Sequence, residues 1–140
     1  MNPDSEGWSF DTYYIFFKKS DYDSFTIGYG INKHFPELKV VGLIDWDTFI
    51  LKQSKKIYFT CPCLPTTKSG LAKLSKASLP TKLEKDPRFT DKVLWRVQPI
   101  IFGGSPDSED NMALVTYEQH QQLIIFWNKT FQNYVQNQTN

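Results

Sequence analysis

The first half of the chain alternates apolar and polar positions in short runs, a pattern that predicts β-strands. After a loose start over residues 1–8, residues 11–17 (DTYYIFF) predict a strand, with a helix as the main alternative for so short a run. Residues 23–35 alternate similarly and contain glycines that weaken a helix, so we expect them to complete a hairpin with 11–17. Their alternating apolar positions are Phe25, Ile27, Tyr29 and Ile31.

The next part of the chain predicts two more strands joined by a short helix. The run 38–44 (LKVVGLI) predicts a buried strand. Residues 56–61 predict another strand, which stops at Pro62 because proline cannot donate to a ladder. Between the two strands, Asp45 has the residue type of an N-cap, so we expect a short helix from Asp45 to Gln53.

Residues 66–92 differ in composition from the rest of the chain. They carry seven basic side chains against three acidic ones, and they contain neither Trp nor Tyr. Leu71, Leu74 and Leu79 would form one face of a short helix, which Pro80 interrupts. We expect a basic surface segment or an inserted arm rather than a separate domain.

Strand character then returns and is followed by a long helix. We predict a strand over 93–102, a loop over 103–108 and a short strand over 112–116. Thr116 and Gln119 have the spacing of a capping box. Apolar side chains from Tyr117 onward recur at helical intervals. We therefore predict an amphipathic helix over about 117–135 and a frayed polar tail over 136–140.

The order of these elements predicts an α+β fold. Strands dominate the first half and helices follow, which favours helices packed on one face of an antiparallel sheet. The length of 140 residues fits a single domain, residues 1–140. The formal net charge of only +1 and the 11 Phe, 7 Tyr and 4 Trp argue against disorder and against a strongly basic nucleic-acid binder.

The aromatic residues exceed what a small core obviously requires, so we divide them into two groups. Those assigned to the core are Phe16, Phe17, Phe59, Phe102, Trp127 and Phe131. Those expected to form a partner-facing surplus include Trp8, Tyr13, Tyr22, Tyr29 and Trp46. Tyr and Trp are enriched at binding hot spots, which makes this surplus an argument for an interaction surface.

Few side chains suit catalysis or metal binding. Cys61 and Cys63 flank a proline and are too close for an unstrained disulfide. A zinc site would need both thiols to converge with His34 and His120, which are single and far apart in the sequence. A cysteine nucleophile would need a base beside it, and no motif surrounds either thiol. We therefore predict no catalytic residue, no metal site and no cofactor.

The remaining titratable candidates have structural interpretations. His120 falls in the first turn of the final helix, where the helix dipole favours a neutral imidazole that packs or caps. Asp45 and Asp47 are two residues apart and do not share a helical face, so we interpret them as the start of a helix rather than an acid–base pair.

The charges are segregated although their sum is small. Residues 105–119 carry four acidic side chains and no Lys or Arg, in contrast to the basic segment 66–92. Opposed patches of this kind can steer a charged protein partner, although they also occur on ordinary solvated surfaces. The predicted partner-binding residues are Asp107, Glu109, Asp110, Tyr22, Tyr29 and Trp46.

One string in the C-terminal third is distinctive. It comprises Trp95, Gln98-Pro99-Ile100-Ile101-Phe102-Gly103-Gly104, Pro106, Asp110-Asn111, Thr116, His120 and Trp127-Asn128. This string resembles the end of small bacterial immunity proteins, including those of the SUKH superfamily, in which a GG-x-P loop, a short strand and a helix ending near WN recur. The helix carrying Leu-Pro before a Gly-Gly turn, which that superfamily has nearer the N-terminus, is absent from this sequence.

The resemblance covers residues 95–128 and implies a function without catalysis. It implies a cytoplasmic α+β protein that binds and neutralises a cognate toxin domain, encoded by the adjacent gene. A cytoplasmic location also fits the N-terminus, which lacks the features of a signal peptide, and the absence of an apolar run of about 18 residues.

We therefore expect an immunity protein that is not an enzyme and that binds neither nucleic acid nor membrane. One alternative is a small enzyme or toxin domain that uses His120 with a cysteine or a carboxylate. Another is a nucleic-acid-binding module that uses the basic segment 66–92, although aromatic side chains do not interleave with its lysines.

Overall fold

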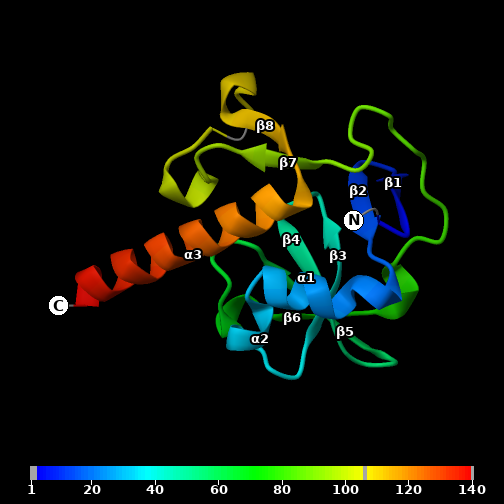
Figure 1. Cartoon of the computed structure of the whole chain (residues 1–140), viewed down its shortest axis with the longest axis horizontal. Coiled ribbons are helices and arrows are strands. Elements are labelled where there is room, and N and C mark those ends of the chain that lie inside the picture. The colour runs from blue at the N-terminus through cyan, green and yellow to red at the C-terminus, as the bar shows by residue number, and fades with distance from the viewer. Residues whose placement is uncertain (1–2, 106, 140) are drawn as a thin grey trace.

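The computed structural model describes residues 3–105 and 107–139, with side chains up to residue 136 (Figure 1). Within these residues six strands form an antiparallel sheet in which neighbours in sequence are neighbours in space. They are β1 (Ser5–Ser9), β2 (Thr12–Phe16), β3 (Lys39–Ile44), β4 (Thr48–Ser54), β5 (Ile57–Pro62) and β6 (Ala72–Leu74). Two later strands, β7 (Val93–Arg96) and β8 (Met112–Val115), pair in a separate antiparallel sheet.

The helices lie between β2 and β3 and at the end of the chain. α1 (Tyr22–Gly28) packs on β3 and is followed by the single turn α2 (Ile31–His34). The first half of α3 (Tyr117–Thr139) packs on α1 and β7, whereas its second half extends away from the body of the molecule (Figure 1). The 3₁₀ turns are η1 (Lys19–Asp21), η2 (Lys68–Gly70), η3 (Lys76–Ser78), η4 (Ile100–Phe102) and η5 (Glu109–Asn111).

This arrangement confirms the predicted α+β single domain and its long C-terminal helix. The capping box is present: the Thr116 hydroxyl accepts from the Gln119 backbone N–H at 3.1 Å, and the Gln119 side chain accepts from the Thr116 N–H at 2.9 Å. No helix in the described part of the chain is both long and apolar enough to cross a membrane. The predicted frayed tail is helical through Thr139, and Asn140 lies outside the described residues.

The predicted second strand of a hairpin, residues 23–35, is wrong, because this segment forms α1 and α2. Both edges of β2 are already paired, with β1 on one side and β3 on the other. The burial follows a helical period instead: Phe25 and Tyr29 lie in the core one turn apart, while Ile27 is exposed.

The predicted short helix from Asp45 to Gln53 is also wrong, because these residues form a tight turn and β4. Asp45 and Trp46 both have positive φ, 49° and 61°, and the Asp47 N–H donates to the Ile44 carbonyl at 3.3 Å. This turn reverses the chain at once, so the apolar run that follows pairs with β3 as a strand.

Two further expectations about the first 92 residues are corrected. The expected loose start contains β1, which pairs with β2. The expected helix through Leu71, Leu74 and Leu79 is absent, because β6 pairs with β5 there and only single 3₁₀ turns surround it. The rest of the basic segment continues as loops and reaches the other edge of the sheet, where Glu84 bridges to Trp8.

The division of the aromatic residues is largely reversed in the structure. Of the predicted core set only Phe17 is fully buried, and the others are half-buried. Tyr13, Tyr29 and Trp46, expected on the surface, are buried. The reason in β2 is strand alternation: Tyr13 and Phe17 face the core, so Phe16 points to the other side. The largest fully buried apolar side chains are Tyr13, Phe25, Phe49, Ile15, Ile31, Leu43, Ile50, Leu51 and Ile124.

Candidate functional site

Three connections meet at one end of the main sheet and surround a cleft of about 600 Å³. Because the sheet is an antiparallel meander, its β1–β2, β3–β4 and β5–β6 connections all emerge at the same end. The second sheet and η4 close the other side. The lining residues are Trp8, Asp11, Asp45, Trp46, Asp47, Thr48, Pro62, Cys63, Leu64, Leu94, Trp95, Arg96, Pro99, Ile100 and Ile101.

Four aromatic rings, from Trp8, Tyr13, Trp46 and Phe89, pack together behind this cleft. Tyr13 stacks on Trp46 with ring centroids 4.4 Å apart, and Trp8 meets both edge-on at 5.1 and 5.9 Å. Phe89 joins them from the basic segment, 5.1 Å from Trp46. Aromatic pairs in these geometries stabilise beyond their buried area, so Trp8 and Trp46 form a rigid wall of the cleft.

The Trp46 turn is fixed by main-chain hydrogen bonds to its neighbours. The Asp45 N–H donates to the Tyr13 carbonyl at 2.7 Å, and the Asp45 carboxylate accepts from the Tyr13 N–H at 2.9 Å. The Cys63 N–H donates to the Asp47 carbonyl at 2.8 Å. These contacts hold a bulky residue in a left-handed conformation that costs roughly 1–2 kcal/mol.

The same end of the sheet contains a second turn with a non-glycine residue at positive φ. Ser9 pairs with Thr12, so the β1–β2 loop has two residues, and the first of them, Phe10, has a φ of 54° where glycine is usual. Its side chain is 99% exposed. Backbone strain of this kind clusters at functional sites, and a fully exposed phenylalanine beside a cleft is the surface feature most in need of explanation.

The rim of the cleft is acidic. Asp11, Asp45 and Asp47 are exposed carboxylates, and Arg96 is the single cation among the lining residues, 3.8 Å from Asp47. Partial burial raises the pKa of Asp47, and the negative charge of Asp45 adds to this, while Arg96 acts in the opposite direction. The field at the mouth of the cleft is therefore negative.

Two buried donors in this region lack acceptors. The indole N–H of Trp46 and the Nε–H of Arg96 have no hydrogen-bond partner among the described residues. Most buried donors in folded proteins are satisfied, so these two unpaired donors are an energetic cost that this end of the fold carries.

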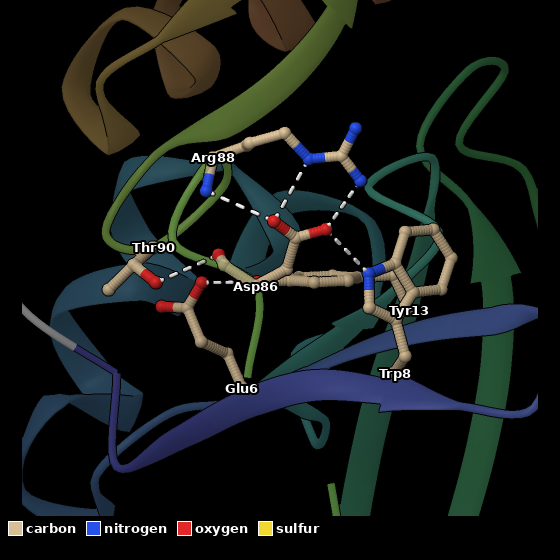
Figure 2. Close-up of polar contacts among 6 residues, drawn as sticks. All are labelled: Glu6, Trp8, Tyr13, Asp86, Arg88 and Thr90. Atoms are coloured by element: carbon tan, nitrogen blue, oxygen red, sulfur yellow. Dashed lines mark hydrogen bonds and ion pairs between the residues drawn. The ribbon is translucent and has the colours of Figure 1, made fainter. Parts of the chain in front are cut away.

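The basic segment is attached beside the cleft through a polar network (Figure 2). The Trp8 indole N–H donates to Asp86 at 3.0 Å, and Arg88 binds the same carboxylate through Nε and a terminal nitrogen at 3.0 and 2.8 Å. The guanidinium and these hydrogen bonds hold the pKa of Asp86 well below its usual range. This clamp fixes the position of Trp8 in the wall.

A buried carboxyl completes the attachment. Glu6 accepts from the Tyr13 hydroxyl at 2.6 Å (Figure 2). It also accepts from the Asp91 N–H at 3.1 Å. Burial raises the pKa of Glu6 despite these two hydrogen bonds, and burial beside Glu6 also raises the pKa of Tyr13. The part of the chain predicted as a basic surface segment or an inserted arm is thus attached to β1 and β2 at several points.

His120 and the cysteines lie inside the fold. His120 is 0% exposed, and its Nδ1 hydrogen-bonds the Tyr29 hydroxyl at 2.6 Å. Burial lowers the pKa of His120 to about 3, which the nearby Trp46 backbone opposes only in part. Cys61 and Cys63 are free and buried, and burial raises the pKa of both thiols. The burial confirms a packing histidine and buried thiols at the end of a strand.

The predicted partner-binding residues are not gathered in one place. Asp107, Glu109 and Asp110 are exposed in the loop that leads into β8. Tyr22 is half-buried, and Tyr29 lies in the core. Trp46 is largely buried, and it is one of the residues that line the cleft. Burial therefore removes Tyr29 from any contact surface, because α1 and α3 cover it.

Sequence reasoning missed Phe10, Asp11 and the apolar lip formed by Ile100 and Ile101. One feature of the sequence indicates this turn: the alternation of apolar and polar residues is interrupted at Phe10-Asp11, between two strand-like runs. An interruption of two residues matches a two-residue hairpin loop, although the usual Gly or Asn is absent. Among the described residues, no group of three or more His, Cys, Asp or Glu side chains is placed to hold a metal ion.

The Gly103-Gly104 loop has a structural role beside the cleft. Gly103 has a φ of 90°, and a Cβ on Gly104 would lie 1.8 Å from the Gln98 carbonyl oxygen. Asn111 ties the same loop together, because its amide accepts from the Gln98 N–H and donates to the Gln98 and Ser105 carbonyls. The loop thereby supports the lip that begins at Pro99.

Comparison with known protein families, curated proteins and solved structures finds no match for this chain.

Proposed function

We propose that the protein is a cytoplasmic immunity protein that binds a cognate bacterial toxin domain and neutralises it by protein–protein contact. The observation that carries this proposal is the exposed Phe10, held on a strained turn whose next residue, Asp11, lines an acidic, tryptophan-walled cleft. An aromatic side chain in this setting is suited to act as the anchor of an interface.

The chemistry of the cleft indicates the partner surface that would fit it. Its apolar lip, with Ile100 and Ile101 about half exposed, suits aliphatic or aromatic side chains. The rim carboxylates suit Lys or Arg. A loop that presents a basic residue next to an apolar one combines these features.

The enzyme alternative depends on His120, and its surroundings do not favour it. A general base must reach a substrate proton and have a pKa near the working pH. His120 is fully buried, and its pKa is lowered to about 3. The cysteines that would accompany it are buried as neutral thiols.

The direct test is co-expression with the product of the adjacent gene. We expect a stable 1:1 complex on size-exclusion chromatography and relief of that product's toxicity. Loss of a catalytic turnover on His120→Ala, without binding to any neighbouring product, would favour the enzyme. Salt-sensitive binding to single-stranded nucleic acid that is weakened by Lys73→Glu or Lys82→Glu would favour the nucleic-acid alternative.

The substitution Phe10→Gly should separate binding from folding. It removes the exposed ring and relieves the positive φ, so affinity for the toxin domain should fall at least about tenfold while the free energy of unfolding stays equal or rises by about 1 kcal/mol. Isothermal titration calorimetry and urea denaturation measure the two quantities. Ile27→Ala is the matched control, because Ile27 is an exposed apolar residue outside the cleft. Unchanged affinity for Phe10→Gly would remove Phe10 from the interface.

The acidic loop is tested separately by reversing its charges. The triple variant Asp107→Lys, Glu109→Lys and Asp110→Lys should weaken toxin binding without unfolding the protein, because all three side chains are exposed. Asp11→Lys makes the same kind of reversal at the cleft. An effect of Asp11→Lys alone would confine the interface to the cleft, and unchanged affinity for the triple variant would exclude the loop.

A further inference from the structure

The outward face of α3 is uncharged over more than two turns and exposes two large apolar side chains between glutamines. Ile125 is 47% exposed and Phe126 is 58% exposed, both in the part of the helix that packs on the domain. From Gln119 to Asn128 the helix carries no charged side chain. Interfaces are depleted of charge and enriched in aromatic residues at their centres, and this face has both properties.

Beside Phe126 the surface has a shallow hollow of about 420 Å³. Val115 of β8 forms one edge of it. The helix contributes Gln119, Gln122, Leu123 and Phe126, which are spaced i, i+3, i+4 and i+7. Four residues with this spacing form the hole that receives a side chain from a facing helix in knobs-into-holes packing.

We propose that two copies of this chain pair through this face, with their α3 helices antiparallel and Phe126 of each copy inserted into the hollow of the other. The hollow and the projecting ring belong to one surface patch, which is the condition for a two-fold symmetric interface. Phe126 then faces the centre of the hole, between Gln122 and Leu123 of the other copy.

The same register aligns opposite charges. In this register, residue 126 of one copy lies opposite positions 122–123 of the other copy. Because the helices are antiparallel, Glu118 of one copy then lies opposite positions 130–131 of the other. Those positions are between one and two residues from Lys129. At a rise of 1.5 Å per residue this offset is about 2 Å, which a long lysine side chain spans. Glu118 and Lys129 are both exposed, and two such pairs flank the apolar centre. The apolar contact and the charges therefore require the same alignment.

This interface is separate from the cleft, because none of its residues lines the cleft. It goes beyond the proposed toxin binding and does not depend on it. A symmetric dimer would present two clefts, one on each copy.

Sedimentation velocity over about a 100-fold range of protein concentration tests the proposal. We expect a reversible monomer–dimer equilibrium for the full chain, which Phe126→Asp shifts to monomer by at least about tenfold in dissociation constant. Phe10→Asp is the control, since it makes the same change at an exposed phenylalanine outside the α3 face. A chain that remains monomeric throughout, or a dimer unaffected by Phe126→Asp, overturns the proposal.

Charge reversal tests the antiparallel register. Glu118→Lys alone and Lys129→Glu alone should each weaken the dimer, because each places like charges opposite one another. The double variant should restore the dissociation constant to within about threefold of the wild type, because both pairs are reversed together. Both positions are exposed, so the variants are expected to fold, and circular dichroism checks this. Failure of the double variant to recover the dimer overturns this register.

Discussion

Acidification from pH 6.5 should steadily reduce the free energy of unfolding of the wild-type protein, and His120→Asn should remove much of this loss. The pKa of His120 is 6.5 when unfolded and falls to about 3 in the folded protein. Between these values the unfolded state binds a proton that the folded state excludes. The contribution of the neutral His120 to the free energy of unfolding is therefore fully present above pH 6.5. Between pH 6.5 and about pH 3 it falls by about 1.4 kcal/mol for each pH unit of acidification. Urea denaturation at several pH values measures it.

Asparagine is the suitable replacement because its amide can hydrogen-bond the Tyr29 hydroxyl in place of Nδ1. Other groups titrate in the same range, so the informative quantity is the difference between wild type and variant. Glu6 acts in the opposite direction: its raised pKa makes the folded state relatively more stable as the pH falls. His34→Asn is the control, because His34 is only half-buried. An equal pH dependence in wild type and His120→Asn would contradict the buried neutral imidazole.

The elements predicted correctly are those whose local pattern and tertiary role agree. The run at 38–44 is buried on both faces as β3, and the capping box at Thr116 sits at the observed start of α3. The strand predicted over residues 23–35 is wrong because the alternating large apolar residues also include a helical spacing, from Phe25 to Tyr29. Only the sheet pairing decides between the two, since β1 and β3 occupy both edges of β2.

The candidate site could be predicted only in fragments. The sequence favours a helix start at Asp45 and Asp47, whereas the structure has a left-handed turn there, because an N-cap and such a turn use the same residue types. The cleft combines turns that are separated by up to about ninety residues, from Asp11 to Ile101, and no local pattern indicates that they meet. The surplus of aromatic residues predicts a partner-facing surface, but in the structure several of these residues form the aromatic core behind the cleft.

Several residues of the string that resembles immunity proteins have structural roles. Gly104 allows the close approach to Gln98, Thr116 caps α3, and His120 packs in the core. These residues of the string therefore stabilise the second sheet, β7–β8, and α3. The binding surface that we propose lies mainly on the turns of the main sheet, which the string does not include.

Asn128→Ala should lower the free energy of unfolding by roughly 2–4 kcal/mol, because Asn128 joins α3 to the buried 63–66 loop. Its amide oxygen accepts from the Thr66 N–H at 2.8 Å, and its amide nitrogen donates to the Cys63 carbonyl at 2.8 Å and to the Thr66 hydroxyl at 3.0 Å. Alanine leaves the buried Thr66 N–H without an acceptor. Urea denaturation at neutral pH measures the loss.

Asn133→Ala provides the control on the same helix, because Asn133 is exposed and its replacement should change stability by less than about 0.5 kcal/mol. Asn128→Asp keeps the acceptor for Thr66 but loses the donor, and it places a negative charge beside the Cys63 carbonyl. At neutral pH it should therefore destabilise at least as much as alanine. Because Cys63 and Leu64 line the cleft, both Asn128 variants should also weaken toxin binding at a temperature where the protein remains folded. A loss below about 1 kcal/mol for Asn128→Ala would mean that the loop is held without α3.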